Sequence, residues 1–171
     1  MSKALLIILV TTILFASCGH GEMTKKEVRE TQLEKSLISY IDTSWNQQDF
    51  SKLNLLVSRD FVRSLNGIKV ASNPNELIAH MKVFFKGFPD LIVKMNEIYI
   101  NEDKIFMRWE CTGNNTGIYG EMPPTGKKVK INGLTHFYFN KGGELYKEDV
   151  YFNELELLQQ LGYTLIPPVL E

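Results

Sequence analysis

The sequence predicts an α+β domain, and three observations support this fold class. Apolar side chains recur mainly at helical spacing up to Gly87. After Pro89 the period changes to about two, as in strands with one buried face, and stays so for most of the remaining chain. Hydrophobic types fill 44% of the 171 positions, enough for one sizeable core. Helices followed by long antiparallel strands favour helices that cover one face of a curved sheet.

The N-terminal segment predicts a leader. Residues 4–16 form an uncharged apolar run, which is shorter than the roughly 20 residues that span a membrane. Small residues directly precede Cys18, as in the lipobox of bacterial lipoproteins, where the cysteine is lipidated and becomes the mature N-terminus. We therefore expect a lipoprotein signal peptide over residues 1–17 and a lipid anchor at Cys18 that holds the protein on a membrane of the bacterial cell envelope. An ordinary cleaved signal peptide is the alternative.

The rest of the chain predicts one domain over residues 31–165, with a polar tether at 18–30 before it and a C-terminal tail at 166–171 after it. Helical spacing predicts a first helix from about residue 25 to residue 46.

Two further helices are predicted before Pro89. Asp49 indicates an N-cap for a short helix over residues 50–57, which a brief extended piece at 59–62 follows. Asn73 followed by a proline predicts the start of the next helix, which extends to residue 87. His80 lies on this helix, and we expect it to be exposed or peripheral.

The period-two half of the chain predicts two pairs of strands. In chain order these strands cover residues 90–101, 104–112, 127–140 and 144–153. The first two form a hairpin, a glycine-rich region separates the pairs, and a short glycine-containing turn joins the last two. A closing helix over 154–161 is expected to end at Gly162.

Composition and motifs exclude several classes of function. A net charge of −1 provides no basic field for a nucleic-acid backbone, so no nucleic-acid partner is expected. The three histidines are far apart in sequence and form no ligand pair, so no metal is expected. The sequence contains neither a nucleotide-binding glycine loop nor a Gly-x-Ser-x-Gly elbow, and no cofactor is expected. Cys111 alternates with apolar strand residues, and we expect it to be buried.

Six short segments along the predicted domain form a recognisable series. They are residues 45–50, 87–91, 107–109, 113–117, 122–127 and 155–162. In order and spacing this series, within about residues 35–163, resembles the SnoaL-like polyketide cyclases. The resemblance implies a nuclear transport factor 2-like cone, a strongly curved antiparallel sheet with N-terminal helices packed over its concave face. It further implies a hollow that holds a small apolar ligand, and a homodimer formed through the sheet.

In those cyclases an aspartate in the hollow works as general acid and base for an intramolecular aldol closure without metal or organic cofactor. The matching position here is Asn153. An amide does not titrate at useful pH and can only donate and accept hydrogen bonds. Asn115 and Ser64 also stand where the family often has histidine. The resemblance therefore implies a depleted acid/base apparatus, in which Asn153 and Asn115 could donate hydrogen bonds to an enolate oxygen.

Two other residues are candidates for a relocated proton carrier. Asp149 shares its predicted strand face with Asn153 and would be a plausible acid/base if buried, or an ion-pair partner of Lys147. His136 lies among aromatic residues and is either a proton shuttle or a packed side chain. Glu148 falls on the opposite face, where we expect a structural or surface role.

Aromatic residues are the candidates to line the ligand site, or to fill core. They are Trp45, Phe84, Phe88, Trp109, Tyr119, Phe137 and Tyr151. Two functions follow from the whole pattern. The first is a lipoprotein whose cone binds a small apolar carbonyl compound, with possible cofactor-free cyclisation or isomerisation. The alternative is a non-catalytic lipoprotein that binds a ligand or a partner.

Overall fold

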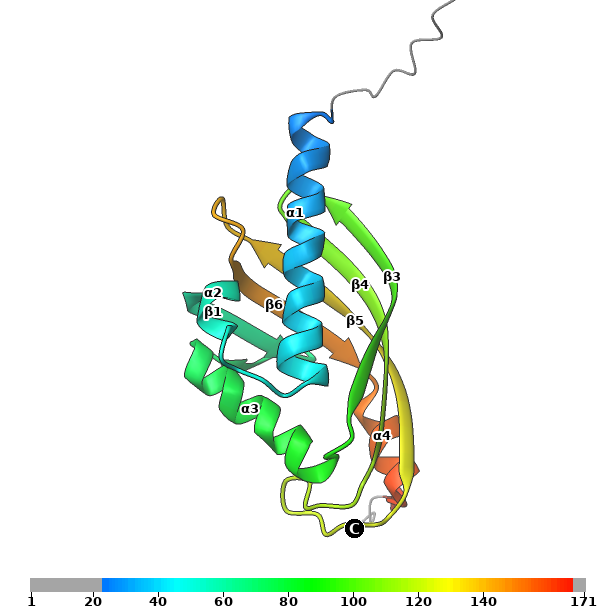
Figure 1. The fold of residues 1–171 in the computed structure, drawn as a ribbon. Coiled ribbons are helices and arrows are strands. Elements are labelled where there is room, and N and C mark those ends of the chain that lie inside the picture. The colour runs from blue at the N-terminus through cyan, green and yellow to red at the C-terminus, as the bar shows by residue number, and fades with distance from the viewer. Residues whose placement is uncertain (1–22, 168–171) are drawn as a thin grey trace, which may run out of the picture.

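A computed structural model describes residues 23–167. It confirms the α+β class, with helices packed on a curved six-stranded sheet (Figure 1). Helix α1 spans Lys25–Ser39, so it begins inside the segment predicted as tether. Thr24 sets this start because its side chain accepts a hydrogen bond from the Glu27 N–H while the Glu27 carboxylate accepts one from the Thr24 N–H.

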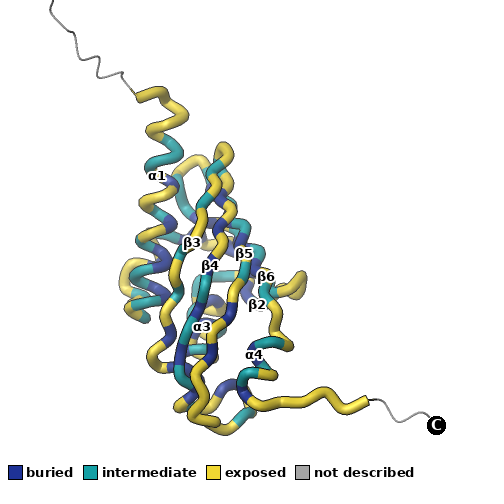
Figure 2. The backbone as a smooth tube through the Cα atoms, turned by 90° about the vertical axis from the view of Figure 1, so that its right-hand side faces the viewer, coloured by how far each residue is buried: buried dark blue, intermediate teal, exposed yellow. Residues whose placement is uncertain are grey.

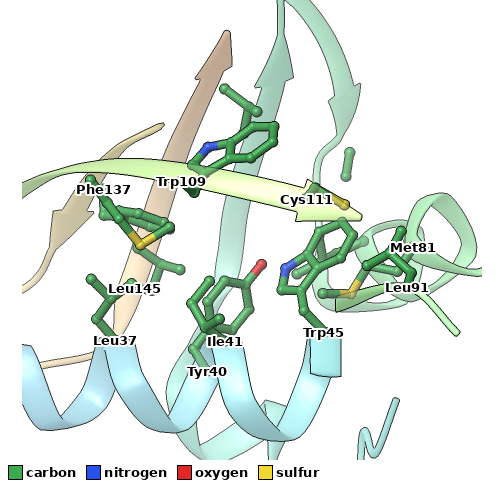
Figure 3. Close-up of a cluster of buried hydrophobic side chains, with 14 of the residues drawn as sticks. Leu37, Tyr40, Ile41, Trp45, Met81, Leu91, Trp109, Cys111, Phe137 and Leu145 are labelled. Atoms are coloured by element: carbon green, nitrogen blue, oxygen red, sulfur yellow. The ribbon is translucent and has the colours of Figure 1, made fainter. Parts of the chain in front are cut away.

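Helix α1 continues as a π-helical segment over Tyr40–Asn46. The wider turn is visible at its end, where the Gln47 N–H donates to the Asp42 carbonyl at 2.9 Å, five residues back. More residues per turn than in an α-helix bring Trp45 round to the side that already carries Tyr40 and Ile41. All three side chains project toward the strand that bears Trp109 (Figure 3). The π segment therefore widens the helical face that covers the sheet.

Of the three other helices described, two begin at an asparagine N-cap, and the third has no side-chain cap. Helix α3 spans Pro74–Gly87 with Asn73 as its cap, and α4 spans Glu154–Leu161 and ends at Gly162, whose φ is 106°. The helix predicted over residues 50–57 is wrong, because α2 covers only Leu53–Leu56 and Asp49 does not cap it. The Asp49 carboxylate instead accepts hydrogen bonds from the backbone and hydroxyl of Ser51, which closes a turn.

One strand of the sheet is longer than the extended piece predicted at 59–62, and another was not predicted. Strand β1 covers Val57–Leu65, and β2 covers Ile68–Ala71. The remaining strands are β3 Ile92–Asn101, β4 Lys104–Asn114, β5 Lys128–Phe139 and β6 Leu145–Phe152. Their spatial order is β2-β1-β6-β5-β4-β3. All neighbours are antiparallel except β1 and β6, which run parallel.

Helices α1 and α3 lie on the inner, hollow face of the sheet, and α4 packs near its far end against β5 (Figure 1). Buried and exposed residues alternate along β4 and β5, as expected for strands with one covered face (Figure 2). The largest fully buried side chains include Tyr40, Phe61 and Phe137. Within residues 23–167, no helix is both long and apolar enough to span a membrane.

Candidate functional site

A cavity lies between the π-helical segment, helix α3 and the inner face of the sheet. Its volume is about 60 Å³, room for a few water molecules or a small organic group. Its apolar wall consists of Ile41, Trp45, Phe84, Leu91, Val93, Met107, Trp109, Cys111, Ile131, Phe137, Val150 and Phe152. Its polar side chains are Arg63, Thr135 and Glu148. A mostly apolar cavity with a few convergent polar groups is the usual form of a small-molecule site.

The two charged residues of the cavity form an ion pair. Arg63 and Glu148 are register partners on the parallel strands β1 and β6, so their side chains emerge side by side. Arg63 Nη1 lies 2.7 Å from Glu148 Oε2, and the exposed fractions of the two residues are 4% and 2%. Buried charges at this depth are retained only when paired. The ion pair is therefore a stable structural part of the cavity wall.

Tyr40 and Trp45, both on the π-helical segment, contact this ion pair. The Tyr40 hydroxyl donates a hydrogen bond to Glu148 Oε2 at 3.0 Å. Burial, with a further contribution from the Glu148 carboxylate, raises the pKa of Tyr40 well above its ordinary value, so the phenol stays neutral. The Arg63 guanidinium lies over the Trp45 ring, with Cζ 4.9 Å from the ring centroid, a cation–π contact. The π-helical segment thus supplies both residues that orient the ion pair.

Thr135 and Trp109 form the other polar contact in the wall. The indole Nε1 of Trp109 donates to Thr135 Oγ1 at 2.9 Å. Gly133 is the register partner of Trp109, and a Cβ at position 133 would overlap the indole ring. Glycine at position 133 therefore leaves the space that the Trp109 indole ring occupies. Cys111 also lines the cavity, and burial raises the pKa of its thiol to about 12, so it stays protonated and unreactive.

The aromatic residues predicted to line a ligand site divide into three groups. Trp45, Phe84 and Trp109 line the cavity, as does Phe137. Phe88 and Tyr119 are buried beside it and pack on each other, with ring centroids 5.4 Å apart. Tyr151 is 49% exposed and lies on the outer face of the sheet, away from the cavity.

Asn115 is buried, and its side chain holds the surrounding loop together through hydrogen bonds. Its amide donates to the carbonyls of Gly87 and Gly117, at 3.1 and 3.0 Å. Its carbonyl oxygen accepts hydrogen bonds from the backbone and the hydroxyl of Thr125, at 2.8 and 3.0 Å. The side chain therefore has all its hydrogen-bonding groups engaged within the protein, and it does not line the cavity.

Asp149 and His136 meet on the outer face of the sheet. They are register partners on β6 and β5, and neither lines the cavity. Lys147 Nζ lies 2.8 Å from Asp149 Oδ2. Burial acts to raise the pKa of Asp149, but Lys147 and neighbouring hydroxyls outweigh it and hold the pKa below its ordinary value. Asp149 is therefore an ion-paired carboxylate at neutral pH, the second of the two interpretations considered above.

His136 lies in a stack of rings that crosses the outer face. Its ring centroid is 3.8 Å from that of Phe106 and 3.9 Å from that of Tyr138. Burial, followed by the charge of Lys104, lowers the pKa of His136 below its ordinary value. The geometry corresponds to a packed histidine on the face opposite the cavity.

Asn153 is the N-cap of α4. Its side-chain oxygen accepts a hydrogen bond from the Glu156 N–H at 3.2 Å, its side chain is exposed, and it does not line the cavity. The residue that the resemblance aligns with the catalytic aspartate thus has a helix-capping role in this fold.

Sequence reasoning missed the charged residues of the site. Glu148 was expected to be structural or at the surface, and it is buried in the cavity wall. Arg63 lay just beyond the brief extended piece predicted at 59–62, and a strand that extends to Leu65 carries it inward. His80, expected to be exposed or peripheral, is half-buried against Phe84, with ring centroids 5.3 Å apart. The signal available in the sequence was that Glu148 shares a strand face with the apolar residues Val150 and Phe152.

The chain matches a model of a protein family. The model described as SnoaL-like polyketide cyclase matches residues 35–161. This range contains the π-helical segment, the cavity and the whole sheet. No curated protein sequence matches the chain.

Several solved structures share the fold. A protein of Jannaschia sp. CCS1, described as a candidate SnoaL-like polyketide cyclase, has a TM-score of 0.73 at 21% identity, over 86% of this chain and 99% of that one. AclR of Streptomyces galilaeus, described as a candidate hydroxylase, has a TM-score of 0.69 at 24% identity, over 78% and 97%. IdmH of Streptomyces antibioticus, described as a candidate polyketide cyclase, has a TM-score of 0.67 at 18% identity, over 77% and 99%.

Proposed function

Because this chain belongs to the SnoaL-like polyketide cyclase family, we propose that its cavity binds a small, mostly apolar carbonyl compound. The observation that supports this most is the composition of the wall, where twelve apolar residues surround three polar side chains. Apolar surface supplies the affinity for such a ligand, and the polar groups orient it.

The volume of the cavity limits the size of the ligand. About 60 Å³ suits a ring or chain of a few carbon atoms. A polycyclic ligand would require side chains such as Phe84 or Trp45 to move outward. We therefore expect compact ketones or esters to bind without rearrangement, and larger ones to bind only with displacement of the aromatic wall.

Both tryptophans of the chain line the cavity, and this makes binding directly measurable. Titration of ¹⁵N-labelled protein with cyclopentanone should shift the two indole N–H resonances in NMR spectra. Backbone resonances on the outer face, such as that of Tyr151, provide an internal control. Saturable shifts confined to the cavity support the proposal, whereas unchanged indole resonances across a series of small ketones would contradict it.

Cofactor-free acid/base chemistry is a second candidate, favoured by the position of Glu148. This buried carboxylate is part of the cavity wall, where it could take an α-proton from a bound ketone. In deuterated water the C–H bond would break, the proton would pass to the carboxylate, and a deuteron from solvent would be returned to carbon. The contacts of Oε2 with Arg63 and Tyr40 support the alternative, a non-catalytic binding protein.

Hydrogen–deuterium exchange at the α-carbon of cyclopentanone distinguishes these two candidates. An enzyme that uses Glu148 should catalyse exchange, and Glu148→Gln should abolish it. Asp149→Asn is the matched control, since Asp149 lies on the opposite face of the same strand. Loss of exchange in Asp149→Asn would contradict a role for Glu148 as the base, and saturable binding without exchange would favour the non-catalytic function.

A lipid anchor at Cys18 is part of the proposal. Cys18 lies outside the described residues, and the sequence pattern around it supports lipidation. We expect Cys18→Ser to move the protein from the membrane fraction to the soluble fraction of the bacterial envelope. Cys111→Ser, a change at a buried thiol, should leave the distribution unaltered. Membrane attachment that persists in Cys18→Ser would count against the anchor.

A homodimer formed through the sheet is the expected assembly. The outer face exposes Tyr99, Phe106, Leu134 and Tyr151, which supports burial against a second copy. Sedimentation velocity should then give a dimer, and Leu134→Lys should shift it toward the monomer. A monomer at high protein concentration would contradict this assembly.

A further inference from the structure

Arg63 presents a hydrogen-bond donor that the protein does not use. Its Nε is inaccessible to solvent and has no hydrogen-bond partner within residues 23–167. Nη1 is also buried without a hydrogen bond, and its 2.7 Å contact with Glu148 Oε2 is an ion pair. The residue is 4% exposed and lines the cavity. A buried N–H group without a partner is costly, particularly on a charged side chain. This side chain therefore provides an unfilled position for an acceptor atom at the cavity.

The guanidinium is held in place before any ligand enters. Glu148 contacts it at Nη1, at 2.7 Å, and the Trp45 ring lies against it, with Cζ 4.9 Å from the centroid. Tyr40 in turn donates to Glu148 and fixes the carboxylate. A group that is already oriented loses little conformational freedom on binding, so its hydrogen bond contributes fully to affinity.

We propose that Arg63 is the residue that anchors the ligand, and that it does so by donating its Nε–H to an uncharged acceptor oxygen of a ketone, aldehyde or ester. This inference rests on the proposed function of the cavity. The apolar wall then surrounds the hydrocarbon part of the ligand.

Charge balance in the wall explains the preference for an uncharged oxygen. The Glu148 carboxylate already neutralises Arg63, so a carboxylate ligand would place a second negative charge beside Glu148 in surroundings of low polarity. His80 supplies no compensating positive charge at neutral pH, because burial, followed by the charge of Arg63, lowers its pKa to about 4. A ketone oxygen accepts the hydrogen bond without this repulsion.

Three probes of matched shape test the inference. Cyclopentanone, cyclopentane and cyclopentanecarboxylate share one ring and differ in the polar group. Indole N–H shifts in NMR titrations give the dissociation constant of each. We expect cyclopentanone to bind about tenfold more tightly than cyclopentane, the usual effect of one hydrogen bond to a charged donor, and cyclopentanecarboxylate to bind most weakly.

Two variants assign the preferences to the ion pair. Glu148→Gln should raise the affinity for cyclopentanecarboxylate about tenfold or more, because Arg63 then lacks its counter-charge. The double variant Arg63→Met with Glu148→Gln avoids an unpaired buried charge and should bind the ketone and the hydrocarbon equally well. Arg108→Met, which alters an exposed arginine paired with Glu97, is the matched control and should retain the wild-type order.

The outcomes separate this inference from the proposed function. If none of the probes binds, the proposed function fails. If cyclopentanone and cyclopentane bind with equal affinity to the wild-type protein, the cavity binds small molecules but Arg63 does not anchor them. Unchanged carboxylate affinity in Glu148→Gln would likewise overturn the charge selection.

Discussion

Arg63 and Glu148 face each other across the only parallel strand pair described between residues 23 and 167, with Nη1 of one 2.7 Å from Oε2 of the other. Because both side chains are almost fully buried, each charge depends on the other to remain in the interior. The pair also lines the cavity, so it links the stability of the fold to the chemistry of the site.

Removal of one partner should therefore be far more costly than removal of both. We expect Arg63→Met to lower the free energy of unfolding by about 3–5 kcal/mol, because it leaves the Glu148 carboxylate uncompensated. The double variant with Glu148→Gln should recover a large part of this loss. Urea unfolding measures each value. Arg108→Met, in an exposed pair, should cost at most about 1 kcal/mol, and an equal cost at both sites would contradict the interpretation.

Asn153 should behave as a helix cap. Asn153→Ala removes the oxygen that accepts the Glu156 N–H, and we expect a loss of about 1 kcal/mol in the free energy of unfolding. Asn153→Ser and Asn153→Asp keep an acceptor and should retain most of the stability, which thermal or urea unfolding can measure. A strong gain in α-proton exchange activity in Asn153→Asp would indicate instead that this position reaches the ligand.

His80 should make the stability depend on pH. Burial lowers its pKa in the folded state from the ordinary 6.5 to about 4. Between these values the unfolded chain binds a proton that the folded protein does not, so the free energy of unfolding falls as pH decreases through this window. We expect His80→Gln to flatten that part of the profile in urea unfolding between pH 7 and pH 4. Parallel profiles for the two proteins would contradict the prediction.

Gly133 should be intolerant of a side chain. A Cβ at this position would overlap the Trp109 indole, so Gly133→Ala should push the ring away from β5 and weaken its hydrogen bond to Thr135. Overpacking of this kind costs about 1–3 kcal/mol. Loss of stability should be accompanied by a shift of one indole N–H resonance and by weaker cyclopentanone binding. Gly142→Ala, in an exposed turn, is the control.

The elements that the sequence predicted well carry strong local signals. Asn73 followed by Pro74 marks the start of α3, and Gly162 marks the end of α4. The hairpin of β3 and β4 follows from regular alternation. In contrast, β2 is only four residues long, and five of the nine residues of β1 are polar or charged, so β1 becomes a strand through its pairing with β6, which is distant in sequence. Such long-range pairing overrides weak local preference.

By itself, the sequence determined the α+β class, the family and the division of β6 into two faces, with Glu148 on one and Asp149 on the other. Only the tertiary structure decided which face lies inward. Alternation has a period of two and is symmetric between the faces, and aromatic residues stand on both. Helix packing turned Glu148 and Val150 toward the cavity and left Asp149, His136 and Tyr151 outside. The chemistry of the site was therefore settled by long-range packing, which no local pattern contains.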